Sequence, residues 1–443
     1  MKKADLIITA GHVLTMNADL DTIESGAVAV NGGRIVAVGT ADHICAEYCA
    51  EKMLGGPHTV LFPGLVNTHT HSPMVYFRGL GDDLPLKVWL EEHIWPAENK
   101  WLSHAFVRDA AELACLEMLR AGITVFSDMY FYGDAIAESV NKSGMRAIIG
   151  AGILDFPSVT ARTADEYLVN ADRFIRDWIG DDLVVPAVAP HAPYTCSPET
   201  MRKAKELSRR HQVPLHLHLS ETRWEVQEII NRYGRRPIEL LFDHGILDEH
   251  VIAAHCVWPS DEEIDMLAES GVHVAHCIES NLKMASGIAP VVKMLGAGVR
   301  VTFGTDGAAS NNDLDILSEM ATAAKVHKVT SEDPTALNAR QVMLMATRAG
   351  AEALGLGSIS GSIECGKSAD MVLADTNRPH LVPLYDIYSH IVYSMKSSDV
   401  TGVMVRGRVL IENGRPTTLD EDAILEKARV WAGKVAGKIS HSA

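Results

Sequence analysis

Hydrophobic and polar positions follow two different patterns along the 443 residues of the chain. Between about residues 60 and 350, short apolar runs alternate with amphipathic stretches of helix length, which predicts repeated strand–helix units and a parallel sheet. Eight apolar runs favour a closed (β/α)8 barrel over an open sheet. The predicted strands are Thr59–Thr68, Gly122–Asp128, Arg146–Asp155, Leu183–Pro190, Pro214–Leu219, His250–His255, Val272–His276 and Val299–Thr305. The predicted helices include Ala105–Ala121, Ser197–His211, Arg223–Tyr233 and Asp261–Ser270.

The two ends of the chain share another pattern, in which Val- and Ile-rich runs are separated by glycine turns. Asn31-Gly32-Gly33 lies between two such runs and predicts a hairpin. Similar runs return near residues 369–374 and 403–410. We therefore expect one small β-sandwich domain built from both chain ends, the barrel between them, and a helix within Asp420–Ile439. The expected boundaries are 1–60 with 362–420, then 61–361, then 421–443.

Composition and charge exclude several classes of partner. Lys and Arg number 40 against 57 Asp and Glu, which gives a net charge of −17 and no basic patch, so we expect no binding to nucleic acid or to anionic membranes. No apolar stretch approaches the ~20 residues of a membrane helix, and the N-terminus lacks a signal-peptide pattern. The seven cysteines form no CxxC pair, which argues against a disulfide framework and a cysteine zinc site. A soluble cytoplasmic protein is expected.

Reactive side chains follow the C-terminal ends of the predicted barrel strands, where barrel enzymes place their chemistry. Each one alone has a structural explanation, because paired histidines on a strand are commonly half-buried packing residues. Together they offer the three or four nitrogen and oxygen ligands that a catalytic zinc or iron ion requires. In chain order they are His69, His71, His216, His218, His255 and Asp306.

Two of these assignments need a choice between neighbours or roles. Side-chain alternation directs His216 and His218 the same way, and we assign His218 as the ligand and His216 as packing one layer deeper. Glu221, three residues further on, could cap the next helix through the helix dipole. We favour a chemical role for Glu221, because a metal-activated water needs a group that moves protons to the leaving group.

Five sequence motifs together make the chain recognisable. They closely resemble the 5-methylthioadenosine/S-adenosylhomocysteine deaminase group of the amidohydrolase superfamily, and the resemblance extends from Met1 to about Asn413. The motifs containing IWPAE and PHAPYT are specific for this group, whereas HTH and TDG indicate only the superfamily. The motifs are PGLVNTHTH (63–71), DDLPLKVWLEEHIWPAE (82–98), PHAPYTCS (190–197), LHLSET (217–222) and TDGAASNNDLD (305–315).

The resemblance implies a function and a set of site residues. It implies one divalent metal ion, usually zinc with Fe2+ or Mn2+ as alternatives, and hydrolysis of an adenine nucleoside to the inosine analogue and ammonia. Glu221 would handle the proton on the purine ring nitrogen, His255 would orient the water, and Asp306 would take the proton of the water. The implied metal ligands are His69, His71, His218 and Asp306. The implied substrate contacts are Glu98 with the ribose hydroxyls, His191 with the nucleoside, and Arg162 with an anionic tail.

Substrate preference and assembly remain more open at this point. Ala151 stands where relatives that prefer S-adenosylhomocysteine often carry a second Arg, so methylthioadenosine or adenosine is expected to compete well. Trp95 is either helix core or a platform for the purine ring. The alternatives are an amidohydrolase for another heterocycle, of guanine, pterin or triazine type, and an inactive barrel scaffold. The expected partner is a small nucleoside substrate, and we expect a homo-oligomer.

Overall fold

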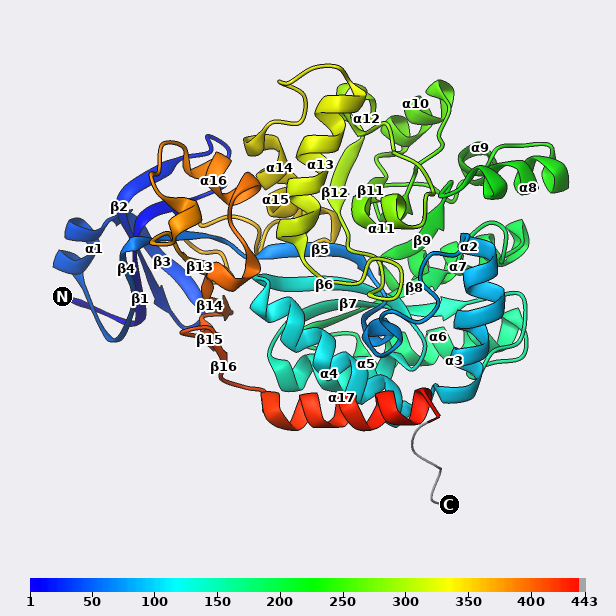
Figure 1. Cartoon of the computed structure of the whole chain (residues 1–443), viewed down its shortest axis with the longest axis horizontal. Helices are drawn as coiled ribbons and strands as arrows, with labels where there is room; N and C mark the ends of the chain where they lie inside the picture. The colour runs from blue at the N-terminus through cyan, green and yellow to red at the C-terminus, as the bar shows by residue number, and fades with distance from the viewer. Residues whose placement is uncertain (438–443) are drawn as a thin grey trace.

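The computed structural model describes residues 1–437, and its centre is a barrel of eight parallel strands (Figure 1). Each strand is hydrogen-bonded to the next along the chain from β5 to β12. Between these two end strands, the Thr68 hydroxyl of β5 donates to the carbonyl oxygen of Phe303 in β12 at 2.8 Å. The predicted (β/α)8 barrel is therefore confirmed. The strands are β5 (Leu65–Thr70), β6 (Ile123–Tyr130), β7 (Arg146–Ile153), β8 (Val184–Pro190), β9 (Leu215–Leu219), β10 (Val251–His255), β11 (His273–His276) and β12 (Arg300–Phe303).

An apolar cluster fills the barrel at the N-terminal ends of its strands. Val66, Val125, Ile148 and Ile252 lie near the beginnings of four strands and are fully buried against one another and Leu354. Burying such side chains stabilises the fold by about 1.5–3 kcal/mol each. The barrel is therefore solid at this end, and space for a ligand is left at the C-terminal ends.

The first predicted barrel strand, Thr59–Thr68, is wrong, although the other seven agree with the structure within two residues. Thr59–Pro63 is the end of β4 (Tyr48–Pro63), which belongs to a second sheet, and the barrel strand begins only at Leu65. A Cβ atom on Gly64 would lie 2.0 Å from the Thr124 hydroxyl oxygen. Only glycine fits this close approach, and the continuous apolar run hid the break between the two strands.

The second sheet contains eight strands from both ends of the chain, in the order β16-β15-β14-β13-β4-β1-β2-β3. It is one continuous mixed sheet, and the predicted hairpin is confirmed, because Asn31 of β2 pairs with Arg34 of β3 across Gly32 and Gly33. How the chain divides into domains at the predicted boundaries stays a prediction. The strands are β1 (Lys2–Leu14), β2 (Thr22–Asn31), β3 (Arg34–Thr40), β4, β13 (Met371–Asp375), β14 (Val400–Val405), β15 (Arg408–Glu412) and β16 (Arg415–Pro416).

Helices cover the outside of the barrel, and side-chain caps fix where several of them begin (Figure 1). Ser197 caps α7, Thr222 caps α8 and Ser260 caps α10, each accepting a hydrogen bond from the backbone N–H three residues on. The predicted helices agree with α4, α7, α8 and α10 within one residue. The helices before the barrel's fourth strand are α1 (Ala41–Glu47), η1 (Ser72–Phe77), α2 (Leu86–Val88), η2 (Trp89–Ile94), α3 (Trp95–Trp101), α4 (His104–Arg120), α5 (Gly133–Ser143) and α6 (Ala164–Trp178). The later ones are α7 (Pro198–His211), α8 (Arg223–Tyr233), α9 (Pro237–Asp243), α10 (Asp261–Ser270), α11 (Ile278–Lys283), α12 (Val291–Gly296), α13 (Ile316–Thr330), α14 (Ala339–Ala346), α15 (Arg348–Ala353), η3 (Pro379–Leu381), α16 (Ile387–Tyr393), η4 (Ser397–Asp399) and α17 (Glu421–Val435).

The C-terminal helix α17 runs along the outside of the barrel beside α4 (Figure 1). Trp431 and Lys427 both bind Asp109 of α4, at 3.1 and 3.2 Å. Residues 438–443 of the predicted C-terminal helix lie outside the described residues. Within residues 1–437, every helix is too short or too polar to cross a lipid bilayer.

A buried ion pair joins the barrel to the second sheet. Arg146 at the start of β7 donates to Asp370, which directly precedes β13, at 3.0 Å, and the Asp370 side chain is 1% exposed. Asp370 also accepts from the backbone N–H of Arg406. Removal of one partner would leave an uncompensated charge in the interior.

We expect Asp370→Ala to lower the free energy of unfolding by about 3 kcal/mol, because Arg146 loses its buried counter-charge. Urea denaturation of the two proteins measures this. Asp182→Asn is the matched control, because Asp182 pairs with Arg406 on the surface and should cost less than about 1 kcal/mol. Equal, small losses for both variants would contradict a structural role for the Arg146 pair.

Candidate active site

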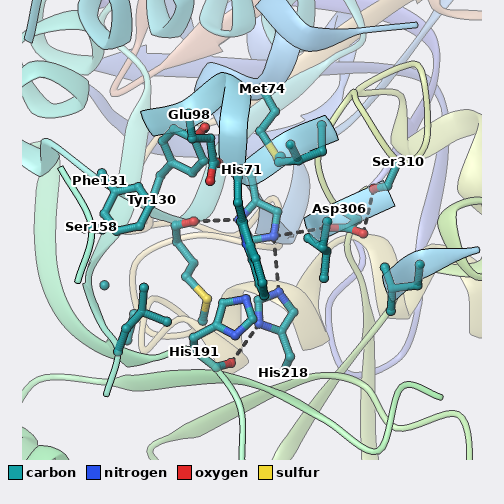
Figure 2. Close-up of a pocket in the computed structure, with 18 of the residues that line it drawn as sticks. His71, Met74, Glu98, Tyr130, Phe131, Ser158, His191, His218, Asp306 and Ser310 are labelled. Atoms are coloured by element: carbon teal, nitrogen blue, oxygen red, sulfur yellow. Dashed lines mark hydrogen bonds and ion pairs between the residues drawn. The ribbon is translucent and has the colours of Figure 1, made fainter. Parts of the chain in front are cut away.

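The four predicted ligands meet at the C-terminal end of the barrel, and Figure 2 shows His71, His218 and Asp306 turned towards one another. His69 is the fifth residue of β5 and His71 directly follows the strand, His218 lies in β9, and Asp306 lies in the loop after β12. One potential ligand atom from each residue falls within 4.8 Å of all the others. The structure thus brings together the ligand set that the sequence predicted.

Hydrogen bonds to backbone carbonyls orient His71 and His218. His71 Nδ1 donates to the Met129 carbonyl at 2.6 Å, and His218 Nδ1 donates to the His191 carbonyl at 2.8 Å. When it is neutral, each ring therefore directs the lone pair of Nε2 inwards, and the two Nε2 atoms lie 3.2 Å apart. Two facing lone pairs repel each other unless a positive charge binds both. A cation at this point resolves the conflict, so the residues fit a metal ion.

His69 is oriented by another histidine. Its Nδ1 atom lies 2.8 Å from His216 Nε2, and His216 Nδ1 lies 3.1 Å from the Ser127 hydroxyl. His69 Nε2 is buried, has no hydrogen-bond partner among the described residues, and lies 3.3 Å from Asp306 Oδ1. His216 is fully buried as expected, but it does more than pack, because it holds the ring of a candidate ligand.

Asp306 directs one carboxylate oxygen to the imidazoles and the other to hydroxyl groups. Oδ1 lies 3.2 Å from His71 Nε2, while Oδ2 accepts from Ser280 and Ser310 at 2.7 and 2.8 Å. Burial alone would raise the pKa of Asp306, but His69 and His71 hold it well below its usual value. Burial alone would lower the pKa of His71, but Asp306 raises it to about 9. The cluster therefore favours a positive charge at its centre.

The loops that carry the site have a strained backbone. Ser220, His255 and Asp306 follow or end their strands with φ angles of 51°, 74° and 59°. Such left-handed conformations are costly for residues with a side chain and persist only where surrounding contacts fix them. Glu225, in the first turn of α8, fixes one of them by accepting from the backbone N–H groups of Ser220 and Glu221 at 2.9 and 2.8 Å.

Glu221 presents a buried carboxyl group next to the ligand cluster. Its Oε1 atom accepts from the Ser286 hydroxyl at 3.1 Å, and Oε2 lies 3.9 Å from His255 Nε2. Burial raises the pKa of Glu221, and the nearby His255 partly offsets this rise. Thr222, not Glu221, caps α8. The alternative explanation of Glu221 as a helix cap is therefore wrong.

His255 is held by the loop that follows β11. Its Nδ1 atom lies 3.0 Å from the Asn281 side-chain oxygen and donates to it, which directs Nε2 towards Glu221. The ring of His255 stacks on that of His218, with centroids 5.5 Å apart. His255 and Glu221 are thus close enough to the ligand cluster to act on a molecule bound beside it.

A cavity of about 340 Å³ opens directly above the cluster and contains the predicted nucleoside contacts Glu98 and His191. Glu98 accepts from the Tyr130 hydroxyl at 2.6 Å. Burial raises the pKa of Glu98 to about 7, although the Tyr130 hydrogen bond lowers it. Trp95 lines the same cavity and lies 5.6 Å from the Phe156 ring. Trp95 is therefore part of the cavity wall.

Arg162 is the one predicted site residue that the structure leaves outside. It is exposed in the turn before α6 and is not among the residues that line the cavity. Its backbone N–H donates to the Glu166 carboxylate at 2.7 Å. The structure thus does not bring Arg162 to the cavity, and its contact with an anionic tail stays a prediction that rests on an ambiguous loop alignment.

Several supporting residues escaped the sequence-based prediction. The carbonyl groups of Met129 and His191 act through the backbone, which any residue type supplies, so no sequence signal marks them. Asn281 lies 26 positions from His255 in the chain, and only the fold brings its side chain next to the His255 ring. Glu225 lies three residues after Thr222, a spacing typical of a helix N-terminus, and this pattern could have identified it.

A parallel (β/α)8 barrel with three inward imidazoles and a carboxylate at its C-terminal end is the architecture of a metal-dependent hydrolase. The chain belongs to the amidohydrolase family, whose model matches residues 60–410, and within it to the 5-methylthioadenosine/S-adenosylhomocysteine deaminase group. Its site is that of a divalent metal ion.

Individual relatives are similar to the chain over nearly their whole length. A 5-methylthioadenosine/S-adenosylhomocysteine deaminase of Thermodesulfovibrio yellowstonii is 51% identical, covering 97% of this chain and 98% of its own. A 5'-deoxyadenosine deaminase of Methanosarcina acetivorans is 45% identical, covering 98% and 99%. The crystal structure of an adenosine deaminase from Xanthomonas campestris with bound zinc is 40% identical, covers 98% and 99%, and superposes with a TM-score of 0.97.

We expect His69→Ala to purify without a full metal complement, because one of the four candidate ligands is removed. Elemental analysis of the purified protein gives the metal content per chain. His43→Ala, which changes an exposed histidine of α1, should keep the wild-type content. A full complement in His69→Ala would remove His69 from the ligand set.

We expect His216→Phe to weaken metal binding about 10- to 100-fold, because His69 loses the acceptor that fixes its tautomer. Competition with a chelator measures this affinity, and circular dichroism verifies that the barrel is folded. Ser127→Ala removes only the outer hydrogen bond of this chain and should cause a smaller loss. An unchanged affinity in His216→Phe would show that His216 only packs.

Proposed function

We propose that the protein hydrolytically deaminates adenine nucleosides, among them methylthioadenosine, S-adenosylhomocysteine and adenosine, to the inosine analogue and ammonia. The observation that carries this proposal is the buried carboxyl group of Glu221 beside the ligand cluster. The same cavity contains Glu98 and His191. The names of the relatives, which are deaminases of adenine nucleosides, support this substrate class.

The ligand set fits zinc, which we propose as the native ion. Three imidazole nitrogens and one carboxylate oxygen are ligands that zinc commonly takes, and the similar Xanthomonas enzyme was crystallised with zinc. When bound, such an ion lowers the pKa of water towards 7 and so supplies a nucleophile at neutral pH. Fe2+ and Mn2+ are the alternatives that elemental analysis distinguishes.

Glu221 would move the proton that the purine ring needs. Attack of water at C6 pushes electron density onto N1, and protonation of N1 keeps the loss of aromaticity from becoming too costly. Burial raises the pKa of Glu221 and therefore favours a protonated carboxyl that can donate at N1. Glu225 would act as a positioning residue, because it holds the backbone of Glu221 in place.

Asp306 and His255 would handle the protons of the attacking water. Asp306, whose pKa is held well below its usual value, stays ionised and can accept a proton through Oδ1. Asp306 would later return a proton to the departing ammonia. His255 directs Nε2 towards Glu221 and would orient the water and exchange a proton with it.

Glu98 and His191 would recognise the sugar. Glu98 accepts one hydrogen bond from Tyr130, which leaves acceptor capacity for ribose hydroxyl groups. His191 Nδ1 is engaged with the Thr195 hydroxyl, so the other edge of its ring is free to contact the nucleoside. Trp95 lies beside Glu98 on the same helix and would cover one face of the ligand.

A side-by-side ultraviolet assay of the metal-loaded enzyme tests the proposed reaction. Adenosine, 5'-deoxyadenosine, methylthioadenosine and S-adenosylhomocysteine should each be converted with release of ammonia, and guanine should not. Turnover of guanine alone would support the other class of heterocycle, and no turnover of any adenine nucleoside would refute the proposal.

We expect Glu221→Gln to lower kcat by about 10²- to 10⁴-fold with its metal retained, because glutamine cannot carry the proton. Steady-state kinetics and elemental analysis measure the two quantities. Glu269→Gln, an exposed glutamate of α10, should behave as wild type. Unchanged kcat in Glu221→Gln would remove Glu221 from the mechanism.

The remaining assignments, of location and partners, are also proposals. The net charge of −17 supports an enzyme that acts on free nucleosides in the cytoplasm, without nucleic acid or membrane partners. The homo-oligomer stays a prediction that light scattering of the purified protein would test.

A further inference from the structure

The carboxyl group of Glu221 is held by a side chain from a different loop. The Ser286 hydroxyl donates to Glu221 Oε1 at 3.1 Å, and both residues are buried, with 6% of each exposed. The other carboxyl oxygen, Oε2, lies on the side of His255, 3.9 Å from its Nε2 atom. Glu221 lines the cavity above the ligand cluster, whereas Ser286 lines a neighbouring cavity. Ser286 thus contacts Glu221 from outside the space that would hold the purine ring.

The end of α11 fixes the backbone of Ser286. The Ser286 N–H donates to the Asn281 carbonyl at 2.9 Å, and the Ala285 N–H donates to the Leu282 carbonyl at 3.1 Å. Ala285 itself has a left-handed φ angle of 52°. Two such bonds around a left-handed residue form a Schellman motif, in which glycine is the usual residue. With alanine there the turn is strained, and it persists only because surrounding contacts fix it.

Trp258, in the loop after β10, supplies such a contact. Its ring N–H donates to the Ser286 carbonyl at 2.7 Å, and its backbone N–H donates to the carbonyl of Ser220 at 3.0 Å. A Cβ atom on Gly287 would lie 2.7 Å from the Trp258 ring, so only glycine lets the ring approach this closely. Because Ser220 directly precedes Glu221, Trp258 ties the loop of the hydroxyl to the loop of the carboxyl.

Asn281 connects the same segment to His255. Its side-chain oxygen accepts from His255 Nδ1 at 3.0 Å, while its backbone carbonyl accepts from the Ser286 N–H. The segment from Asn281 to Ser286 therefore contacts both of the groups that would move protons beside the ligand cluster. One helix end, clamped by Trp258, sets where the His255 ring and the Glu221 carboxyl lie relative to each other.

We propose that Ser286 is a positioning residue for proton transfer, which fixes the Glu221 carboxyl so that Oε2 carries the proton to the purine ring. The inference rests on the proposed function, because that function gives the proton step to Glu221. A hydroxyl that donates to Oε1 makes Oε1 the carbonyl oxygen of the protonated group and leaves the hydrogen on Oε2. The O–H bond at Oε2 breaks as the N–H bond forms at N1, and the carboxylate recovers a proton from the attacking water.

The physical reason for such a hold is the freedom of a glutamate side chain. Its terminal torsion has broad preferences, so an unheld carboxyl rotates readily. A proton donor must stay within about 2.6–3.2 Å of the atom that it protonates. The Ser286 hydrogen bond limits this rotation without occupying the oxygen that reacts.

Kinetics of two Ser286 variants test the proposal. We expect Ser286→Ala to lower kcat for methylthioadenosine about 3- to 10-fold and to change KM less than about twofold, because the carboxyl loses one hydrogen bond that the substrate does not share. Ser286→Thr keeps a hydroxyl donor and should recover about half of the wild-type kcat or more. Ser362→Ala is the matched control, because the Ser362 hydroxyl donates to the Glu364 carboxylate in the segment before β13, and it should change neither constant.

Trp258→Phe tests the clamp. This variant keeps an aromatic ring but loses the N–H that binds the Ser286 carbonyl, so kcat should fall by less than in Ser286→Ala. Added to Ser286→Ala, it should lower kcat no further, because both changes act through the same hydroxyl. Full additivity of the two losses would show that Trp258 does not act through Ser286.

Crystal structures of the metal-loaded wild type and variants separate this inference from the proposed function. In Ser286→Ala the Glu221 carboxyl should move or adopt more than one conformation. A displaced carboxyl supports the hold of Ser286 on Glu221 even if the wild type hydrolyses no adenine nucleoside. An unmoved Glu221 in Ser286→Ala, or an unchanged kcat in an active enzyme, overturns the proposal. A kcat that stays low in Ser286→Thr, although its hydroxyl lies on Glu221 in the crystal, overturns it as well.

Discussion

The site depends on one constraint: the four histidines of the cluster all use Nδ1 for a hydrogen bond away from the centre. The partners are the Met129 and His191 carbonyls, His216 and Asn281. The four Nε2 atoms are therefore left to the centre, beside a carboxylate that two serine hydroxyls hold in place. A site built in this way is organised for a cation before the cation binds, which limits the reorganisation that binding and catalysis require.

This constraint is met because the barrel aligns the ends of strands that are far apart in the sequence. Ala254 of β10 pairs with His218 of β9, so His255 emerges one residue beyond the ligand on the neighbouring strand. Strained residues then turn the chain away from each strand, and contacts such as those of Glu225 maintain the strain. Rigid strands and fixed turns together place the buried carboxyl group of Glu221 beside the ligand cluster, next to His255.

The sequence predicted the parts of this arrangement that depend on residue type and on the spacing of apolar positions along the chain. Strand and helix patterns identified the barrel, and the histidines at strand ends identified the cluster. Three features were beyond reach for physical reasons. Gly64 separates two strands inside one apolar run, the backbone carbonyls that orient the rings can belong to any residue, and the Arg162 loop has no period that fixes its register. His216 was placed correctly in the interior, but its role depends on a contact with a residue 147 positions away.

The passage of the chain through Gly64 also has a consequence during synthesis on the ribosome. Phe62 of β4 pairs with Val372 of β13, so one edge of β4 has its partner only after some three hundred further residues have been translated. Throughout that interval the nascent chain carries an unpaired strand edge directly upstream of the first barrel strand. Such edges invite pairing with other chains. This edge of β4 therefore stays open until β13, close to the C-terminal end of the chain, has been made.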